Sequence, residues 1–169
     1  MRVWEHIATT APIHEWGRSC AYDRGHLYGT FEDCVQSLNV STGQWEELPR
    51  LSEYRYHATP CVVDGRLFII GGEMASAVEY VASEQRWVSV LDMPREVWDA
   101  AAVALDGKLL VIGGVDPDTG EALSAVLEYN LVDRSWKELP SLLTGRSSCA
   151  ATVLGVTWWS WAVTVRIVT

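Results

Sequence analysis

The sequence predicts an all-β protein built from a repeated antiparallel sheet unit, and two observations carry this prediction. Tryptophan recurs at Trp4, Trp45, Trp87 and Trp136, at intervals of 41, 42 and 49 residues. A block with an Asp-Gly pair, a short apolar run and a Gly-Gly pair stands before Trp87 and returns before Trp136. Self-similarity with a period of about 20 to 50 residues is typical of folds that stack one small unit.

The first two strands of the unit, a and b, follow from two apolar runs and a turn. Residues 66–70 are apolar throughout after Arg66 rather than alternating, which is typical of a strand covered on both faces. A second apolar segment, 58–63, precedes them, and the Asp64-Gly65 pair between the two suits a tight hairpin turn with positive φ. The corresponding parts of the next repeat are 100–105, Asp106-Gly107 and 108–112.

Strands c and d follow the glycine pair. Residues 71–72 end strand b, where missing side chains let the backbone bend or approach its neighbours closely. We expect strand c at 78–81, a polar turn at 83–85 and a strand d that opens with Trp87. The next repeat places 113–114, 126–131, 132–134 and Trp136 in the same order. Truncating a buried Trp to Ala costs about 3 to 5 kcal/mol, so we expect these rings to pack between adjacent sheets.

The repeat is less regular toward both ends of the chain. Residues 23–28 align with the entry into strand b, but 29–31 replace the expected apolar pair and glycines. Residues 4–7 align with a strand d whose own a, b and c strands are absent, so we expect the chain to begin inside a unit. Residues 146–154 have the spacing that opens a further repeat.

The repeat pattern breaks after residue 155, and two interpretations stand beside each other. Residues 156–163 could be a divergent, Trp-rich final strand. Alternatively, the chain leaves its reading frame near Gly155, because shifting each codon by two bases permits an apolar stretch ending in Gly-Gly at 158–163. That stretch is in register with 67–72. We therefore divide the chain into repeats at 1–155 and a tail at 156–169, for which we favour the frame-shift hypothesis.

A strand-ending Gly-Gly followed by a Tyr seven residues before a Trp resembles the kelch repeat. The pairs are Tyr80 with Trp87 and Tyr129 with Trp136, and the resemblance covers about residues 3–154. It implies a partial kelch β-propeller of four-stranded antiparallel blades. Propellers close with about four to eight blades, so this chain is expected to form about half a ring. An open arc leaves apolar sheet faces uncovered, and we expect it to be marginally stable alone.

The resemblance also implies where a partner protein binds. In kelch proteins of the ubiquitin-ligase adaptor type, the binding face carries the b-to-c and d-to-a loops. By position, the d-to-a loops present Arg18, Tyr54, Arg55, Tyr56, Trp98 and Arg146, and the b-to-c loops present Glu73, Met74, Asp116 and Asp118. Arg and aromatic side chains are enriched at binding hot spots. The alternative for Arg55 and Arg146 is that they only hydrogen-bond neighbouring loop carbonyls. Residues 117–120 lie in a seven-residue insertion that is either a recognition element or a solvated turn.

Charge and composition narrow the class of partner and the compartment. A formal net charge of −9 argues against nucleic acid, which is bound by clustered Lys and Arg. No signal peptide and no apolar run of about 18 residues is present, so we predict no membrane association. The four cysteines, Cys20, Cys34, Cys61 and Cys149, have no metal-site spacing. We expect buried, reduced thiols in a cytoplasmic protein.

Catalysis has little support in the sequence, which predicts a binding protein rather than an enzyme. The four histidines form no H-E-x-x-H pair, and we predict no cofactor and no metal. We predict a protein-protein interaction module, either substrate recognition in a ubiquitin-ligase adaptor or a cytoskeletal scaffold. Its further partners would be a cullin-type ligase complex or actin, through domains absent here. The alternative is a fragment of a kelch-like propeller enzyme such as a copper oxidase or a sugar epimerase.

Overall fold

The computed structural model describes residues 19–156 and 163–168, and every element in these ranges is a β-strand. Three antiparallel sheets have four strands each, in the order of the sequence. The first contains β1 (Cys20–Asp23), β2 (His26–Phe31), β3 (Cys34–Asn39) and β4 (Gln44–Glu47). The second contains β5 (Thr59–Val63), β6 (Arg66–Ile70), β7 (Ala77–Val81) and β8 (Arg86–Ser89). The third contains β9 (Ala101–Leu105), β10 (Lys108–Ile112), β11 (Val126–Asn130) and β12 (Ser135–Leu139).

A fourth, two-stranded sheet follows. It pairs β13 (Ala150–Val156) with β14 (Val163–Val168), with a register shift between Val153 and Val156. The first two strands of each four-stranded sheet are joined by two residues, whereas six residues separate β13 from β14. Residues 157–162 lie outside the described residues, and so do 4–7. The frame-shift hypothesis and the isolated strand d at the start of the chain therefore stay predictions.

The two-residue turns explain why the first two strands of each sheet could be located from sequence. At Asp64-Gly65 both residues have positive φ, 52° and 77°. Asp106-Gly107 has 49° and 69°. This backbone twist matches that of the strands on either side of a tight hairpin. Strand pairing then runs without a break from Val63 opposite Arg66 to Thr59 opposite Ile70.

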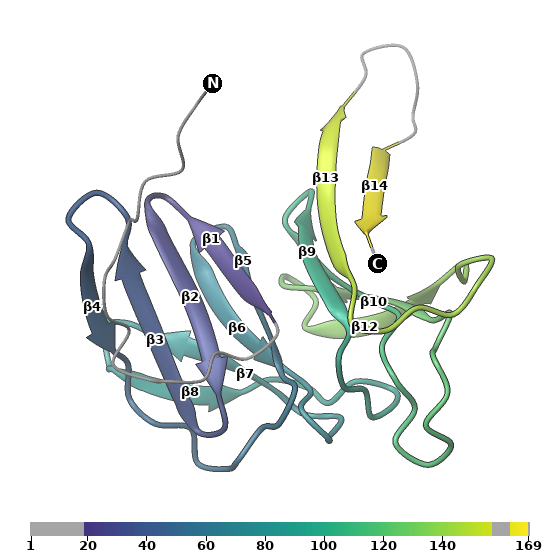
Figure 1. The fold of residues 1–169 in the computed structure, drawn as a ribbon, viewed down its shortest axis with the longest axis horizontal. Helices are drawn as coiled ribbons and strands as arrows, with labels where there is room; N and C mark the ends of the chain where they lie inside the picture. Colours follow the sequence, from purple (N-terminus) through teal and green to yellow (C-terminus); the bar gives the residue numbers. More distant parts are fainter. Residues whose placement is uncertain (1–18, 157–162, 169) are drawn as a thin grey trace, which may run out of the picture.

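The sheets stand side by side as blades of an open arc (Figure 1). Their first strands are neighbours, because β5 lies beside both β1 and β9, and β13 lies beside β9. The predicted fold, a partial propeller of four-stranded antiparallel blades, is confirmed.

The core lies between blades rather than within them. Phe68 and Ile70 of the second blade pack with Leu109 and Val111 of the third. The opposite face of the second blade, which includes Ile69, packs against the first blade in a separate cluster. Because neighbouring residues of β6 serve different clusters, its sequence is apolar at every position after Arg66.

The recurring tryptophans join neighbouring blades. Trp87 lies directly opposite Tyr80 across β7 and β8, which explains the seven-residue spacing between them. Its Nε1 donates a hydrogen bond of 2.6 Å to the carbonyl of Pro49, which follows the first blade. Trp136 donates in the same way to Leu91, which follows the second blade, at 2.6 Å. Both rings are half-buried, so each tryptophan packs at the rim of an interface and fastens it by its polar atom.

Two other predictions concern the burial of the cysteines and membrane-spanning segments. The prediction that all four thiols are buried is wrong for Cys20, which is exposed on β1, the first strand of the first sheet. Cys34 and Cys61 are buried, and Cys149 is intermediate. Within the described residues, no helix is long and apolar enough to cross a membrane.

Candidate functional site on the loop face

Five connections longer than two residues emerge at the same end of the blades. They lie on the lower side of Figure 1. Because the strands are antiparallel, the b-to-c and d-to-a connections share one end of each sheet and the a-to-b turns lie at the other. We call this end the loop face. It consists of residues 48–58, 71–76, 90–100, 113–125 and 140–149.

The glycine pairs lock these loops together across blades. The N–H of Gly114 donates to the carbonyl of Arg146 at 2.7 Å, and the N–H of Gly72 donates to that of Val97 at 3.3 Å. A Cβ atom placed on Gly113 would stand 2.2 Å from the Arg146 carbonyl oxygen. Only glycine permits this approach, so each b-to-c loop is seated against the following d-to-a loop.

Arg55 lies inside the loop face rather than on it. Arg55 is only 4% exposed. Nη1 donates to the carbonyls of Gly71 and Ser76, both at 2.9 Å, and Nη2 donates to Ser76 Oγ at 2.8 Å. Burial lowers the pKa of the guanidinium, and the nearby carboxylates of Glu53 and Asp92 oppose that shift. Arg55 therefore anchors the b-to-c loop of the second blade and offers no free guanidinium at the surface.

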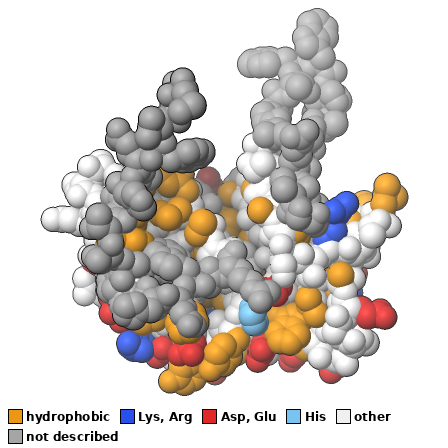
Figure 2. Space-filling model, in the orientation of Figure 1, with side chains coloured by type: hydrophobic (Ala, Val, Ile, Leu, Met, Phe, Trp, Pro, Cys, Tyr) orange, Lys and Arg blue, Asp and Glu red, His pale blue; other side chains and the backbone are white. Residues whose placement is uncertain are grey.

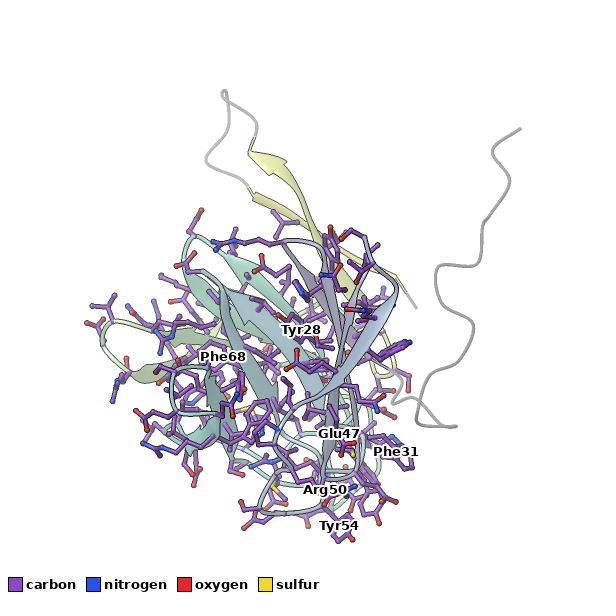
Figure 3. All side chains as sticks on the ribbon, turned by 90° about the vertical axis from the view of Figure 1, so that its left-hand side faces the viewer. Tyr28, Phe31, Glu47, Arg50, Tyr54 and Phe68 are labelled. Atoms are coloured by element: carbon purple, nitrogen blue, oxygen red, sulfur yellow. The ribbon has the colours of Figure 1, made fainter. Side chains whose placement is uncertain are left out.

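The residues on either side of Arg55 point the other way. Tyr54 is 59% exposed and Tyr56 is 45% exposed. Their rings are stacked, with centroids 6.2 Å apart and an angle of 15° between the planes. Figure 3 shows Tyr54 at the lower extremity of the molecule, with Arg50 and Phe31 above it. An anchored backbone thus presents two aligned aromatic rings to solvent.

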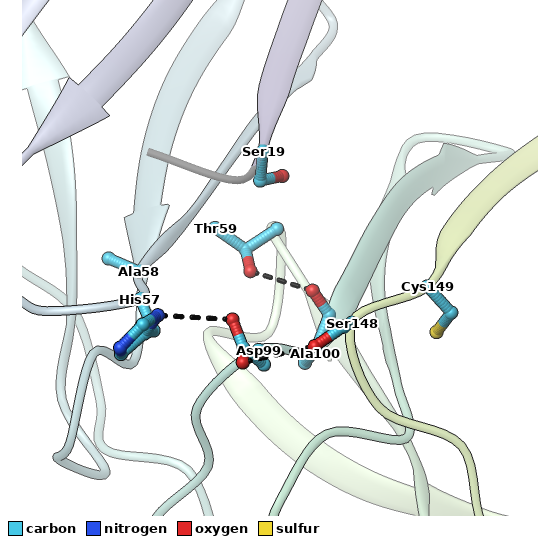
Figure 4. A pocket seen from close by; sticks show the side chains of 8 residues that line it. All are labelled: Ser19, His57, Ala58, Thr59, Asp99, Ala100, Ser148 and Cys149. Atoms are coloured by element: carbon cyan, nitrogen blue, oxygen red, sulfur yellow. Dashed lines mark hydrogen bonds and ion pairs between the residues drawn. The ribbon is translucent and has the colours of Figure 1, made fainter. Parts of the chain in front are cut away.

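Three further residues lie close together beside a small pocket, as Figure 4 shows. His57, Asp99 and Ser148 occupy equivalent places just before the first strand of successive blades, and each has positive φ. Asp99 joins the other two, because His57 Nδ1 lies 3.2 Å from Oδ1 and the Ser148 hydroxyl donates to Oδ2 at 3.1 Å. The backbone repeats the chain, from Ser148 N–H to the Asp99 carbonyl at 2.9 Å and from Asp99 N–H to the His57 carbonyl at 3.2 Å.

This polar chain borders a cavity of about 20 Å³, which is the size of one water molecule. The carboxylate stands between the histidine and the serine, so the His57 ring is not the group bonded to the Ser148 hydroxyl. A serine nucleophile needs an adjacent base in that place. This trio was not predicted from the sequence, because its three members differ in residue type. The repeat alignment, which puts them at one position, was the available signal.

The other predicted residues are spread over the loop face. Glu73 and Asp118 are exposed, whereas Met74, Trp98, Asp116 and Arg146 are half-buried. Met74 pairs with Val97 in an isolated bridge, and the Trp98 ring meets His57 edge-on at 5.8 Å. Arg18 lies outside the described residues. The structure therefore exposes Tyr54 and Tyr56, leaves Trp98 half-buried and buries Arg55.

The inserted loop of the third blade has a defined base and an exposed tip. Asp116 Oδ1 accepts the N–H groups of Asp118 at 2.9 Å and Thr119 at 3.1 Å, and the N–H of Gly120 donates to the Asp116 carbonyl at 2.8 Å. Val115 pairs with Ala122 at the base. Residues 117–122 are all exposed, as the Pro, Asp and Gly content predicted. Asp116 is thus occupied in holding the turn.

Among the described residues, no group of three or more His, Cys, Asp and Glu side chains is placed to hold a metal ion.

Comparisons with known proteins agree with the fold. The family model described as Kelch motif matches residues 99–143, which include the whole third blade. The chain is 28% identical over 135 residues to alpha-scruin of Limulus polyphemus, covering 73% of this chain and 15% of that protein. It is 31% identical over 136 residues to Kelch-like protein terF of Aspergillus terreus, covering 70% of this chain and 29% of that protein.

Two further comparisons add an F-box protein and a solved structure. The chain is 32% identical over 123 residues to F-box protein AFR of Arabidopsis thaliana, covering 64% of this chain and 32% of that protein. The solved structure of YjhT superposes with a TM-score of 0.76 at 15% identity, covering 86% of this chain and 57% of that one. This likeness shows the fold. The chain thus spans less than a third of the length of these three curated relatives.

Proposed function

We propose that this chain, which belongs to the kelch-repeat family, is a protein-interaction module that binds a partner protein on its loop face. The observation that carries the proposal is the stacked pair Tyr54 and Tyr56, exposed on either side of the buried Arg55. Tyrosine supplies a large contact area for little loss of conformational entropy, and it is enriched at binding hot spots.

The anchoring of the loop supports the same proposal. Three hydrogen bonds from Arg55 fix the backbone between the two rings before any partner arrives. Rigid presentation reduces the ordering cost of association, which otherwise offsets part of the contact energy. Trp98 adds a third aromatic side chain on the adjacent d-to-a loop, where its ring contacts His57.

The finer role that we propose is recognition within a longer adaptor protein in the cytoplasm. Support comes from the relatives, which include F-box protein AFR of Arabidopsis thaliana and a "Kelch repeat and BTB domain-containing protein 2" of Ectromelia virus. The four cysteines are all free thiols, which suits a reducing compartment. In this role the loop face selects the protein that the adaptor brings to its complex.

Affinity capture with a double variant tests the proposal. The full chain and Tyr54→Ala/Tyr56→Ala are used as baits, and captured proteins are quantified by mass spectrometry. We expect a set of proteins that the parent chain captures and the double variant loses, because both rings are removed while the anchoring Arg55 remains. Tyr22→Ala is the matched control, since Tyr22 is 66% exposed on β1, away from the loops. Equal capture by all three baits would contradict the proposal.

A further inference from the structure

The charges around the tyrosine pair distinguish the loop face from an ordinary surface. Acidic side chains are exposed on each of the connections beside it, at Glu53, Glu73, Asp92 and Glu96. Within the described residues, none of these four takes part in an ion pair. Figure 2 shows hydrophobic and acidic side chains gathered along the lower margin of the molecule, where these loops lie.

Among the described residues, the arginines of the same face are either paired with a carboxylate or at least half-buried. Arg50 is bonded to Asp33 at 2.9 Å, and Arg95 to Glu138 at 2.6 Å. Arg55 is buried under the tyrosines with its donors directed to loop oxygens. Arg146 is half-buried on the far side of the arc, near Cys149. Among the described residues of this face, the exposed charges without an ion-pair partner are therefore acidic.

Two of these carboxylates act on the anchoring residue of the loop. Glu53 precedes Tyr54, and both Glu53 and Asp92 act electrostatically on the guanidinium of Arg55. The Asp92 loop is held against the 71–76 loop by the N–H of Met93, which donates to the Ala75 carbonyl at 2.9 Å. Arg55 donates hydrogen bonds to the carbonyls of Gly71 and Ser76 in that same 71–76 loop. The backbone segments that carry these two carboxylates and the two rings are thus joined by hydrogen bonds through the 71–76 loop.

We propose that the partner segment that docks on Tyr54 and Tyr56 is a basic peptide. Its Arg or Lys side chain lies against the tyrosine rings, which attract cations through their faces. Its neighbouring cations pair with the carboxylates of Glu53 and Asp92, because opposite charges across an interface steer association and select the partner. The proposal rests on the proposed function and adds the chemical class of the partner. An acidic or neutral segment would meet uncompensated repulsion or leave these carboxylates unpaired.

Selection from a random peptide library identifies the class without assuming a partner. Phage displaying random 12-residue peptides are selected on the full chain, with counter-selection on Tyr54→Ala/Tyr56→Ala. We expect the tyrosine-dependent peptides to be enriched in Arg and Lys. Enrichment of acidic or neutral peptides would overturn the basic class while leaving partner binding on this face intact. If no peptide depends on the tyrosines, the proposed function fails and the inference fails with it.

A charge-matched pair of variants then tests the carboxylates. The affinity of one selected peptide is measured by fluorescence anisotropy, alongside a copy whose Arg and Lys are replaced by Gln. We expect Glu53→Gln/Asp92→Asn to weaken binding about five- to tenfold, the effect of two partly exposed charge pairs. The control Asp64→Asn/Asp106→Asn removes two exposed charges at the opposite end of the blades, in turns where Asn accepts positive φ. Equal affinities in both double variants, or an unchanged affinity for the Gln peptide, would overturn the proposal.

Discussion

At the scale of single residues, Arg55 shows why a side chain's role is not fixed by its position in a loop. Its sequence neighbours Tyr54 and Tyr56 are exposed, whereas its own guanidinium meets oxygen atoms of Gly71 and Ser76 in the next connection. Those acceptors are 16 and 21 residues away. The sequence located all three residues on the loop face. It could not tell which ones would be buried, because the acceptors come from another segment.

Removing this anchor is expected to destabilise the fold. Arg55→Ala leaves the buried carbonyl of Gly71 without its guanidinium donor and removes one of the two donors to the carbonyl of Ser76, which keeps the N–H of Gly71. We therefore expect the free energy of unfolding to fall by about 3 kcal/mol. Urea denaturation followed by tryptophan fluorescence measures the change. Arg86→Ala is the control, because Arg86 forms only an exposed ion pair with Glu84, and such pairs contribute little. Similar losses in the two variants would contradict a structural role for Arg55.

At the scale of the elements, strand bounds were the most predictable feature. The second strands at 66–70 and 108–112 were predicted to the residue, since an Asp-Gly turn and a Gly-Gly pair delimit them. The first blade was harder, because Phe31 and Glu32 stand where the glycine pair is expected. There β2 and β3 join through a two-residue turn at Glu32-Asp33, and Glu32 itself adopts a φ of 54°. Its b-to-c loop is correspondingly reduced to this turn.

Two glycines with similar backbone angles separate strain from crowding. Gly113 has a φ of 66° and meets the Arg146 carbonyl, whereas Gly120 has a φ of 71° and meets nothing within 4 Å. Gly120→Ala is expected to cost about 1 to 2 kcal/mol from the left-handed backbone alone. Gly113→Ala must also displace the 140–149 loop, so we expect a loss larger by about 2 kcal/mol. Thermal denaturation of the two variants measures the difference. Equal losses of stability in the two variants would show that the 140–149 loop can shift at no cost in free energy.

At the scale of the whole molecule, stability is distributed over interfaces between blades. One cluster joins the first two blades, another joins the second and third, and a third links the third blade to Ala151 of β13. In such an array each unit is stabilised by its neighbours, so that terminal units open first. The period of the sequence predicted the packing of one blade on the next. The hydrogen bonds between the loops, in contrast, are visible only in the structure.

Cysteine labelling can follow this order of opening. Burial raises the pKa of Cys61 from 9.0 to about 12, and burial with a hydrogen bond to Glu47 raises that of Cys34 to about 11. Thiolate is the reactive form, so at pH 8 the folded state suppresses it about a thousandfold at Cys61. We expect Cys20 to react at once, Cys34 of the first blade at moderate urea, and Cys61 at the highest urea. Peptide mapping of the labelled sites gives the order, with Cys20→Ser removing the background.

A single urea midpoint for Cys34 and Cys61 would contradict sequential opening. It would show instead that the cluster between the first two blades is strong enough to make them one cooperative unit.

The inserted loop of the third blade has a consequence for how such a surface diversifies. Its base is closed by the pairing of Val115 with Ala122, and its turn is held by Asp116 from within. The tip at 117–121 is exposed. Gly113, where an added Cβ would collide with the Arg146 carbonyl, lies before the base of the loop. The exposed tip and the residues that hold the loop in place are therefore separate stretches of chain. Because of this separation, a different binding sequence can be grafted into the tip while β10 and β11 keep their register.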